Sequence, residues 1–144
     1  MTTWSSDDRL KLLSEILDEL ANRESDQVIL VEGKRDQSGL KLLGVEGEMI
    51  QVQTRDGIFR VAEQLAREKK RAIILTDWDR KGGHLCRLLR DALAANEVPY
   101  DDKIRGRMAR VSRGEIKDVE SLPSYFSRLV SNARIVDGSG FNAR

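Results

Sequence analysis

The sequence predicts an α/β fold in which a parallel sheet of about four strands carries helices on both faces. Two short apolar runs, residues 28–31 (VILV) and 72–75 (AIIL), have the length and the β-branched content of buried strands. Segments with helical periodicity lie before, between and after these runs, joined by short connections. Strands that alternate with helices in this way favour a parallel sheet with right-handed crossovers.

The first helix is predicted over residues 5–22. Leucines recur there at helical spacing, and Ser5 and Asp8 have the spacing of a capping box. The strand at residues 28–31 follows, and then a helix over residues 35–43, with Gly44 at the position that favours a helix C-terminus.

The middle of the chain continues the alternation. Residues 48–53 are predicted as a strand, residues 57–69 as a helix, and residues 72–76 as the central strand. After Gly83, the spacing of the leucines indicates a strong amphipathic helix that closes near Asn96.

The last third of the chain has weaker patterns. Residues 104–111 alternate loosely and are predicted as a fourth strand; residues 123–131 are predicted as a short helix with Pro123 in its first turn. Residues 137–144 are small and polar, which predicts a loose tail. The expected organisation is an N-terminal helix (1–27) packed on a core domain (28–132), followed by a tail (133–144).

Composition excludes several classes of protein. The 144 residues suit one domain, and the single cysteine, Cys86, excludes an internal disulfide framework and a cysteine-rich zinc site. Neither a leader-like segment nor an apolar run of membrane-spanning length is present, so a soluble, cytoplasmic protein is expected. The charged fraction is 34% but the net charge is only +1, so any nucleic-acid binding must depend on local patches.

Acidic side chains follow the two apolar runs. Asp77 and Asp79 come after residues 72–76, and on an extended chain side chains two apart share a face. Two neighbouring carboxylates repel each other unless a cation lies between them, and Mg²⁺ suits such a site. The alternative is that Asp79 caps the next helix and Asp77 accepts a backbone hydrogen bond. Glu32 follows residues 28–31, so all three acids are predicted at the carboxyl edge of the sheet.

The two motifs together resemble the Toprim family. They are a strand followed by Glu32-Gly33-Lys34-x-Asp36, and a later strand followed by Asp77-x-Asp79-x-x-Gly82. The resemblance covers residues 28–111 and is closest to small stand-alone archaeal and bacterial Toprim proteins. It implies a Rossmann-like sheet, Mg²⁺ or Mn²⁺ held by Glu32, Asp77 and Asp79, and Glu32 as general acid or base in phosphodiester chemistry on RNA or DNA.

Basic residues near these motifs are predicted to bind phosphate. Lys34 and Arg35 lie within the first motif, and Arg80 and Lys81 stand at a helix start, where cations are unfavourable unless an anion is bound. The basic stretch 103–113 is interpreted either as a solvated edge or as a further phosphate contact.

Three functions follow from these patterns. The leading one is a Mg²⁺-dependent, nuclease-like enzyme centred on Glu32, Asp77 and Asp79. The second is a non-catalytic adaptor that binds nucleic acid or protein and uses the basic stretch. The third is a receiver-type phosphoacceptor domain, although Glu32-Gly33 stands where a receiver has adjacent acids. A protein partner or a homodimer is left open, and no membrane partner is expected.

Overall fold

Four parallel strands form a single sheet in the order β2-β1-β3-β4. The structure is a computed structural model that describes residues 4–53 and 55–137. The strands are β1 (Gln27–Val31), β2 (Met49–Gln51), β3 (Arg71–Ile74) and β4 (Tyr100–Asp101). The predicted α/β fold with a parallel sheet is therefore confirmed.

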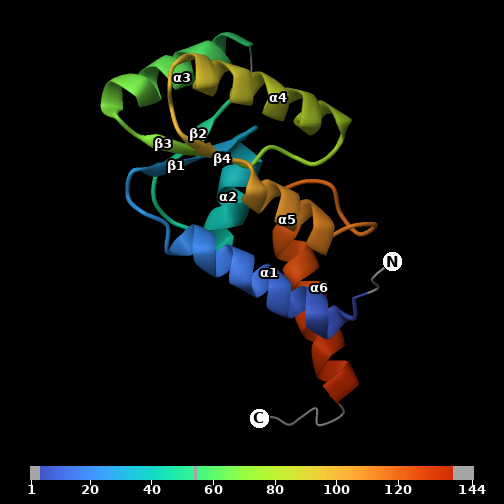
Figure 1. Ribbon diagram of the computed structural model, residues 1–144. Coiled ribbons are helices and arrows are strands. Elements are labelled where there is room, and N and C mark those ends of the chain that lie inside the picture. Colours follow the sequence, from blue (N-terminus) through green and yellow to red (C-terminus); the bar gives the residue numbers. More distant parts are fainter. Residues whose placement is uncertain (1–3, 54, 138–144) are drawn as a thin grey trace.

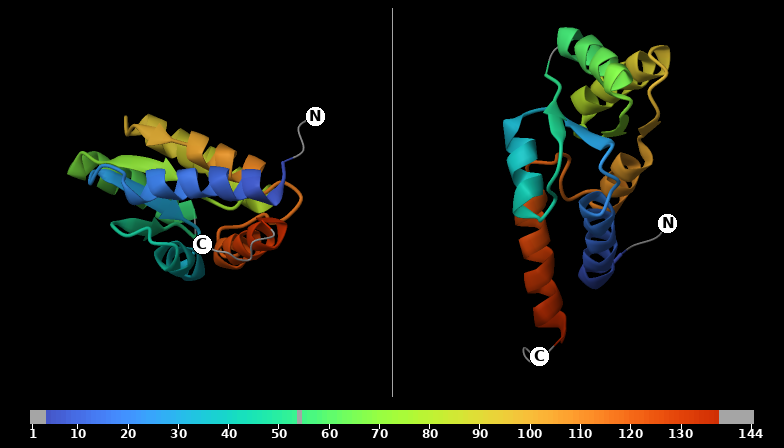
Figure 2. Two further views of the ribbon diagram at one scale, coloured as in Figure 1. Left: turned by 90° about the horizontal axis from the view of Figure 1, so that it is seen from below. Right: turned by 90° about the vertical axis from the view of Figure 1, so that its left-hand side faces the viewer.

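Six helices cover the sheet in the described part of the chain. They are α1 (Ser6–Ala21), α2 (Lys34–Leu42), α3 (Arg55–Glu68), α4 (Arg80–Ala95), α5 (Lys103–Val111) and α6 (Leu122–Asp137). Helices α3 and α4 lie together on one face of the sheet, and α1, α2, α5 and α6 lie on the other (Figure 1). The views in Figure 2 show the same two layers.

The central strands are apolar throughout because both of their faces are covered. Side chains alternate between the faces of a strand, so Val28 and Leu30 pack against the α3 and α4 side, while Ile29 and Val31 pack against the other. All four side chains are fully buried. This double burial explains why the strand has a continuous apolar run instead of an alternating pattern.

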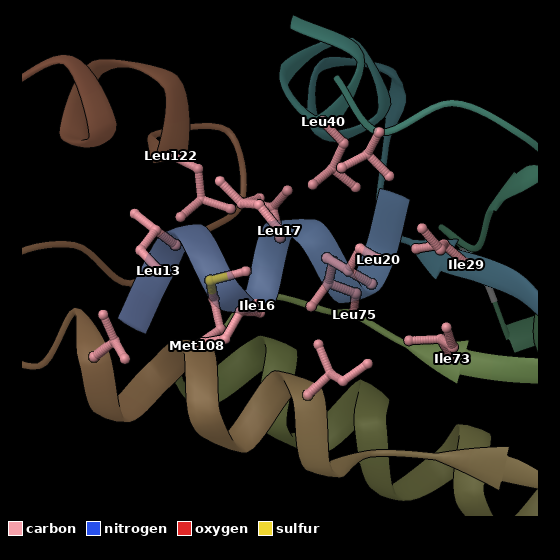
Figure 3. Packing of buried hydrophobic residues seen from close by; sticks show 14 of the residues in the cluster. Leu13, Ile16, Leu17, Leu20, Ile29, Leu40, Ile73, Leu75, Met108 and Leu122 are labelled. Carbon is pink, nitrogen blue, oxygen red and sulfur yellow. The ribbon is translucent and has the colours of Figure 1, made fainter. Parts of the chain in front are cut away.

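Helix α1 provides much of the core on the second face. In Figure 3, Leu13 and Leu17 lie on the side of Leu122 of α6 and Leu40 of α2, while Ile16 lies beside Met108 of α5 and Leu20 beside Leu75; all belong to one buried cluster that includes Ile29 and Ile73 of the sheet. At its start, Ser5 and Asp8 form the predicted capping box, because each side chain accepts a hydrogen bond from the other residue's backbone N–H. Residues outside the two motifs thus form a large part of the core.

The predicted strand at residues 104–111 is wrong. This segment is helix α5, and its buried residues Ile104, Met108 and Val111 recur at helical spacing. The fourth strand is β4, which lies just before α5 and pairs with β3 over two residues. The loose alternation of charged and apolar residues in this stretch came from a helix with one buried stripe.

Other boundaries differ in extent. Strand β2 is shorter than the predicted 48–53, and α4 begins at Arg80, before the glycine pair. Helix α6 is longer than the predicted 123–131 and continues through residues 133–137 of the tail predicted over residues 133–144; residues 138–144 lie outside the described residues. Gly44 follows α2 with a φ of 87°, as expected for a glycine just past a helix C-terminus.

None of the helices in residues 4–53 and 55–137 is long and apolar enough to cross a membrane.

Candidate metal and phosphate site

The two acidic motifs meet at the carboxyl edge of the sheet. Glu32 follows β1 and Asp77 follows β3, and these strands are parallel neighbours in the sheet. The Glu32 carboxylate oxygen Oε2 accepts a hydrogen bond from the backbone N–H of Asp77 at 2.9 Å. Residues from two separate strand-to-helix junctions are thus in direct contact, in the crevice where α/β sheets usually bind ligands.

An open cleft of about 660 Å³ lies above this contact. Its lining combines both charge signs with an apolar wall. The acids are Glu32, Asp36, Asp77 and Glu120, the basic residues are Lys34, Arg35 and Lys81, and the apolar wall is Val52, Ile58, Leu85 and Leu88. Carboxylates surrounded by cations are the composition expected of a site for a metal ion and a phosphate together.

The turn between β3 and α4 brings Asp77 close to the start of α4. A Cβ atom on Gly82 would lie 1.9 Å from the carbonyl oxygen of Asp77, so only glycine allows this approach. The Asp79 carboxylate accepts a hydrogen bond from Gly82 N–H at 2.7 Å, and the Thr76 hydroxyl donates to Gly82 O at 2.8 Å. The motif's last glycine is therefore required by the packing of this turn.

The contacts of Asp77 and Asp79 are those of the alternative in which Asp79 caps the next helix and Asp77 accepts a backbone hydrogen bond. Asp79 caps helix α4, and Asp77 Oδ1 accepts a hydrogen bond from the backbone N–H of Val119 at 3.0 Å. Among the described residues, no three acidic, histidine or cysteine side chains stand close enough to hold a metal ion together. The assignment of Asp79 as a metal ligand beside Glu32 and Asp77 stays a prediction.

Asp77 has a strongly perturbed acidity. Burial of its carboxyl group raises its pKa from the ordinary value of 3.8 to about 7, and the negative charges of Glu32, Asp36 and Asp118 act in the same direction. The hydrogen bond from Val119 opposes this shift only in part. Negative charge is thus disfavoured at Asp77 unless a positive ion approaches it.

Asp36 holds the other motif in shape. Its carboxylate accepts a hydrogen bond from Gly33 N–H at 3.0 Å at the start of α2, and its side chain is buried. Burial raises the pKa of Asp36, and Glu32 adds to this effect. The residue orients the turn that follows Glu32.

The donor set at this edge fits a divalent cation with a preference for oxygen. Mg²⁺ commonly binds through one or two carboxylates and completes its shell with water and substrate phosphate oxygens. Glu32 and Asp77 supply two carboxylates on adjacent junctions of the same cleft. A site with these two ligands does not need Asp79, which is engaged in the cap.

The predicted phosphate-binding residues occupy different positions. Lys34 and Lys81 are exposed and line the cleft. Arg35 also lines it and pairs with Glu120 at 3.4 Å, where both side chains are exposed. Arg80 is exposed at the start of α4 and is not among the residues that line the cleft.

Arg105 is a site-supporting residue that the sequence did not indicate. Its guanidinium donates hydrogen bonds to the carbonyl oxygens of Thr76 at 3.0 Å and Asp77 at 2.7 Å. Arg107 of the same helix instead forms a two-pronged ion pair with Glu19 of α1, at 2.7 Å for one contact. Two arginines of the basic stretch are therefore committed to contacts within the protein.

The segment just before α6 lies against the second motif. Trp78 donates from its backbone N–H to Lys117 O at 2.9 Å and from its indole to Ile116 O at 3.0 Å. The indole packs against the α1 side of the core. With the Val119 contact, residues 116–119 hold the turn that carries Asp77.

A comparison with models of known protein families matches residues 24–113 to the Toprim domain. The chain belongs to the Toprim domain family. The predicted resemblance is thereby confirmed, and the family favours the Toprim interpretation over the receiver-type alternative. Membership of this family implies a metal-binding function related to nucleic acid.

The similar proteins are small archaeal proteins of about the same extent. A UPF0292 protein of Methanosarcina barkeri is 39% identical over 122 residues, which cover 84% of this chain and 85% of that protein. A UPF0292 protein of Methanocaldococcus jannaschii is 34% identical over 123 residues, covering 85% and 95%. A solved structure of a protein from Aquifex aeolicus superimposes with a TM-score of 0.63 at 24% identity, covering 76% of this chain and 96% of that one, and shows the shared fold.

Proposed function

We propose that this Toprim protein is a Mg²⁺-dependent enzyme that cleaves phosphodiester bonds in RNA or DNA. The observation that carries the proposal is the contact between the two motifs: Glu32 Oε2 lies 2.9 Å from the Asp77 backbone nitrogen, inside a cleft that also contains Lys34 and Lys81. Acids alone would repel a phosphate, whereas this cleft offers both an ion site and cations for the phosphate charge.

Each residue has a role that follows from its position. Glu32 and Asp77 would hold the metal ion, which when bound neutralises phosphate charge and orients the reacting oxygens. Lys34 and Lys81 bind the non-bridging oxygens of the phosphate, helped by backbone N–H groups in the first turn of α2, which begins at Lys34 at the cleft. A carboxylate oxygen of Glu32 that does not bind the ion can accept or return a proton.

The adaptor alternative receives less support. It depended on the basic stretch 103–113 as the nucleic-acid contact, yet Arg105 and Arg107 are engaged in contacts within the protein, which leaves Lys103, Arg110 and Arg113 as the exposed cations of the stretch. The cations that remain at the cleft stand beside the acidic pair, which favours chemistry on phosphate over binding alone.

A cleavage assay tests the proposal. End-labelled RNA and DNA strands are incubated with the wild type, Glu32→Gln, and the matched control Glu63→Gln, an exposed acid on α3. We expect cleavage that requires Mg²⁺, that Glu63→Gln preserves, and that Glu32→Gln lowers by about 100-fold or more. Equal behaviour of the wild type and Glu32→Gln on every substrate would contradict it.

A further inference from the structure

An apolar groove of about 350 Å³ adjoins the metal and phosphate cleft. It lies between α3 and α4, which run side by side over the sheet (Figure 1). Its lining is Ile58, Phe59, Leu88, Asp91, Ala92 and Ala95. Ile58 and Leu88 also line the cleft, so the two depressions share a wall.

Helix α4 connects the two depressions along one stripe of its surface. Lys81, Leu85 and Leu88 line the cleft, and Leu88, Ala92 and Ala95 line the groove. Residues three or four apart lie on the same helix face, so these side chains form one continuous path. At 1.5 Å of rise per residue, Ala92 lies about 16 Å from Lys81 along the axis. A polynucleotide held at the cleft therefore reaches the groove within a few nucleotides.

The groove offers an aromatic face and a polar edge. Phe59 is 54% exposed, which is unusual for a ring of this size, and it stands at the groove instead of in the core beneath. Asp91 is exposed at the same groove and can accept a hydrogen bond from an amino group. A planar ligand with apolar faces and amino groups on its edge matches this combination.

We propose that the groove binds an unpaired nucleobase of a single-stranded RNA or DNA whose phosphodiester lies in the cleft. The proposal rests on the function proposed above and specifies its substrate class. In a duplex the bases are stacked and paired, so none is free to enter a groove between two helices, whereas a single strand can turn a base onto an aromatic side chain. The groove therefore selects single strands, and the cleft binds the backbone of either nucleic acid.

Binding measured without metal separates this proposal from the cleavage proposal. Fluorescence anisotropy in EDTA compares three labelled probes of equal length: a single strand, the same strand paired in a duplex, and an abasic strand that has the same phosphates but no bases. The probes are made as RNA and DNA. We expect the wild type to bind the base-bearing single strand roughly tenfold more tightly than the abasic strand.

Three substitutions of Phe59 identify what the groove recognises. Phe59→Ala should remove the preference for the base-bearing strand, Phe59→Trp should keep it, and Phe59→Leu, which keeps an apolar side chain without a ring, should lose most of it. Leu42→Ala, at another exposed apolar position (78%), is the matched control and should bind like the wild type.

Two results would overturn the proposal. One is equal affinity of the wild type for base-bearing and abasic strands. The other is a change of association state in Phe59→Ala by analytical ultracentrifugation, which would make the groove a contact surface between copies of the chain. Loss of cleavage in the separate assay, with the base preference intact, would instead reject the proposed enzyme and leave the groove assignment standing.

Discussion

Gly82 shows how a single residue sets the geometry of the site. A Cβ atom there would lie 1.9 Å from Asp77 O, an approach that needs a shift of the backbone. We expect Gly82→Ala to lower the free energy of unfolding by about 3 kcal/mol or more. Chemical denaturation by urea, followed by circular dichroism, measures this change.

Gly106 provides the matched control for Gly82. It lies in α5 with open space around the position of a Cβ atom. Gly106→Ala should therefore stabilise the protein by about 0.5 to 1 kcal/mol, because alanine has the higher helix propensity. Equal effects of the two substitutions would mean that the close approach at Gly82 is not a packing constraint.

The raised pKa of Asp77 predicts how the free energy of unfolding depends on pH in the absence of metal. Its pKa is about 7 in the folded protein and near 3.8 when unfolded, so between these values the folded state keeps a proton that the unfolded chain has released. The free energy of unfolding should fall as pH rises through this window, and the loss is complete above it. Asp77→Asn removes the titrating group and should flatten the profile, while Asn still accepts the Val119 hydrogen bond.

Thermal unfolding at about pH 5 and about pH 8 in EDTA checks this expectation. Asp36, whose pKa burial also raises, is present in both proteins and contributes a fall of the same sign, so the comparison isolates Asp77. Parallel profiles for the wild type and Asp77→Asn would show that the Asp77 carboxyl group titrates near its ordinary value.

The sequence predicted the meeting of Glu32 and Asp77 because both follow buried strands, and parallel strands end at one edge. It could not decide the role of Asp79, since a carboxylate two residues after Asp77 suits a metal ion and a helix cap equally well. The contact of Asp77 with Val119 depends on a segment far along the chain, for which local patterns give no information.

Helix α5 holds the backbone of the site through Arg105. Arg105 binds the carbonyl oxygens of Thr76 and Asp77, one on each side of the Asp77 α-carbon, so it fixes the backbone from which the Asp77 carboxylate extends. We expect Arg105→Ala to weaken Mn²⁺ binding by about 10- to 100-fold, as removal of groups that orient metal ligands does. Arg105→Lys keeps the charge but loses the two-pronged contact and should recover only part of the affinity.

Arg107→Ala is the matched control on the same helix. Its partner Glu19 lies on α1, away from the cleft, so the substitution should leave Mn²⁺ affinity unchanged and cost at most about 1 kcal/mol of stability. Titration calorimetry with Mn²⁺, beside thermal unfolding of each variant, separates the two effects. Equal metal affinities in Arg105→Ala and the wild type would show that Arg105 serves stability alone.

The error at residues 104–111 explains why Arg105 was missed. A strand in this position would have placed its arginines along a sheet edge, facing solvent or phosphate. As a helix, the segment buries Ile104, Met108 and Val111 and turns Arg105 toward the β3–α4 turn. The presence of Gly106 and the even spread of charges hid the helical stripe from the sequence pattern.

At the scale of the whole molecule, the sheet order β2-β1-β3-β4 accounts for the site. The two longest strands, β1 and β3, are central and adjacent, so the residues that follow them share one cleft. With a net charge of only +1, the protein as a whole exerts little long-range attraction on a polynucleotide, and recognition depends on the cations of the cleft. The layered architecture was predictable from apolar runs and helical periods, whereas the packing of α6 was not.

The most direct measurement is a crystal structure of the protein grown with Mn²⁺, using the anomalous signal of the ion to locate it. A single peak between the carboxylates of Glu32 and Asp77, at roughly 2.1 Å from an oxygen of each, is the predicted result. Binding of the ion elsewhere, or no peak at this edge of the sheet at a saturating concentration, would contradict the claim that the two motifs form one metal site.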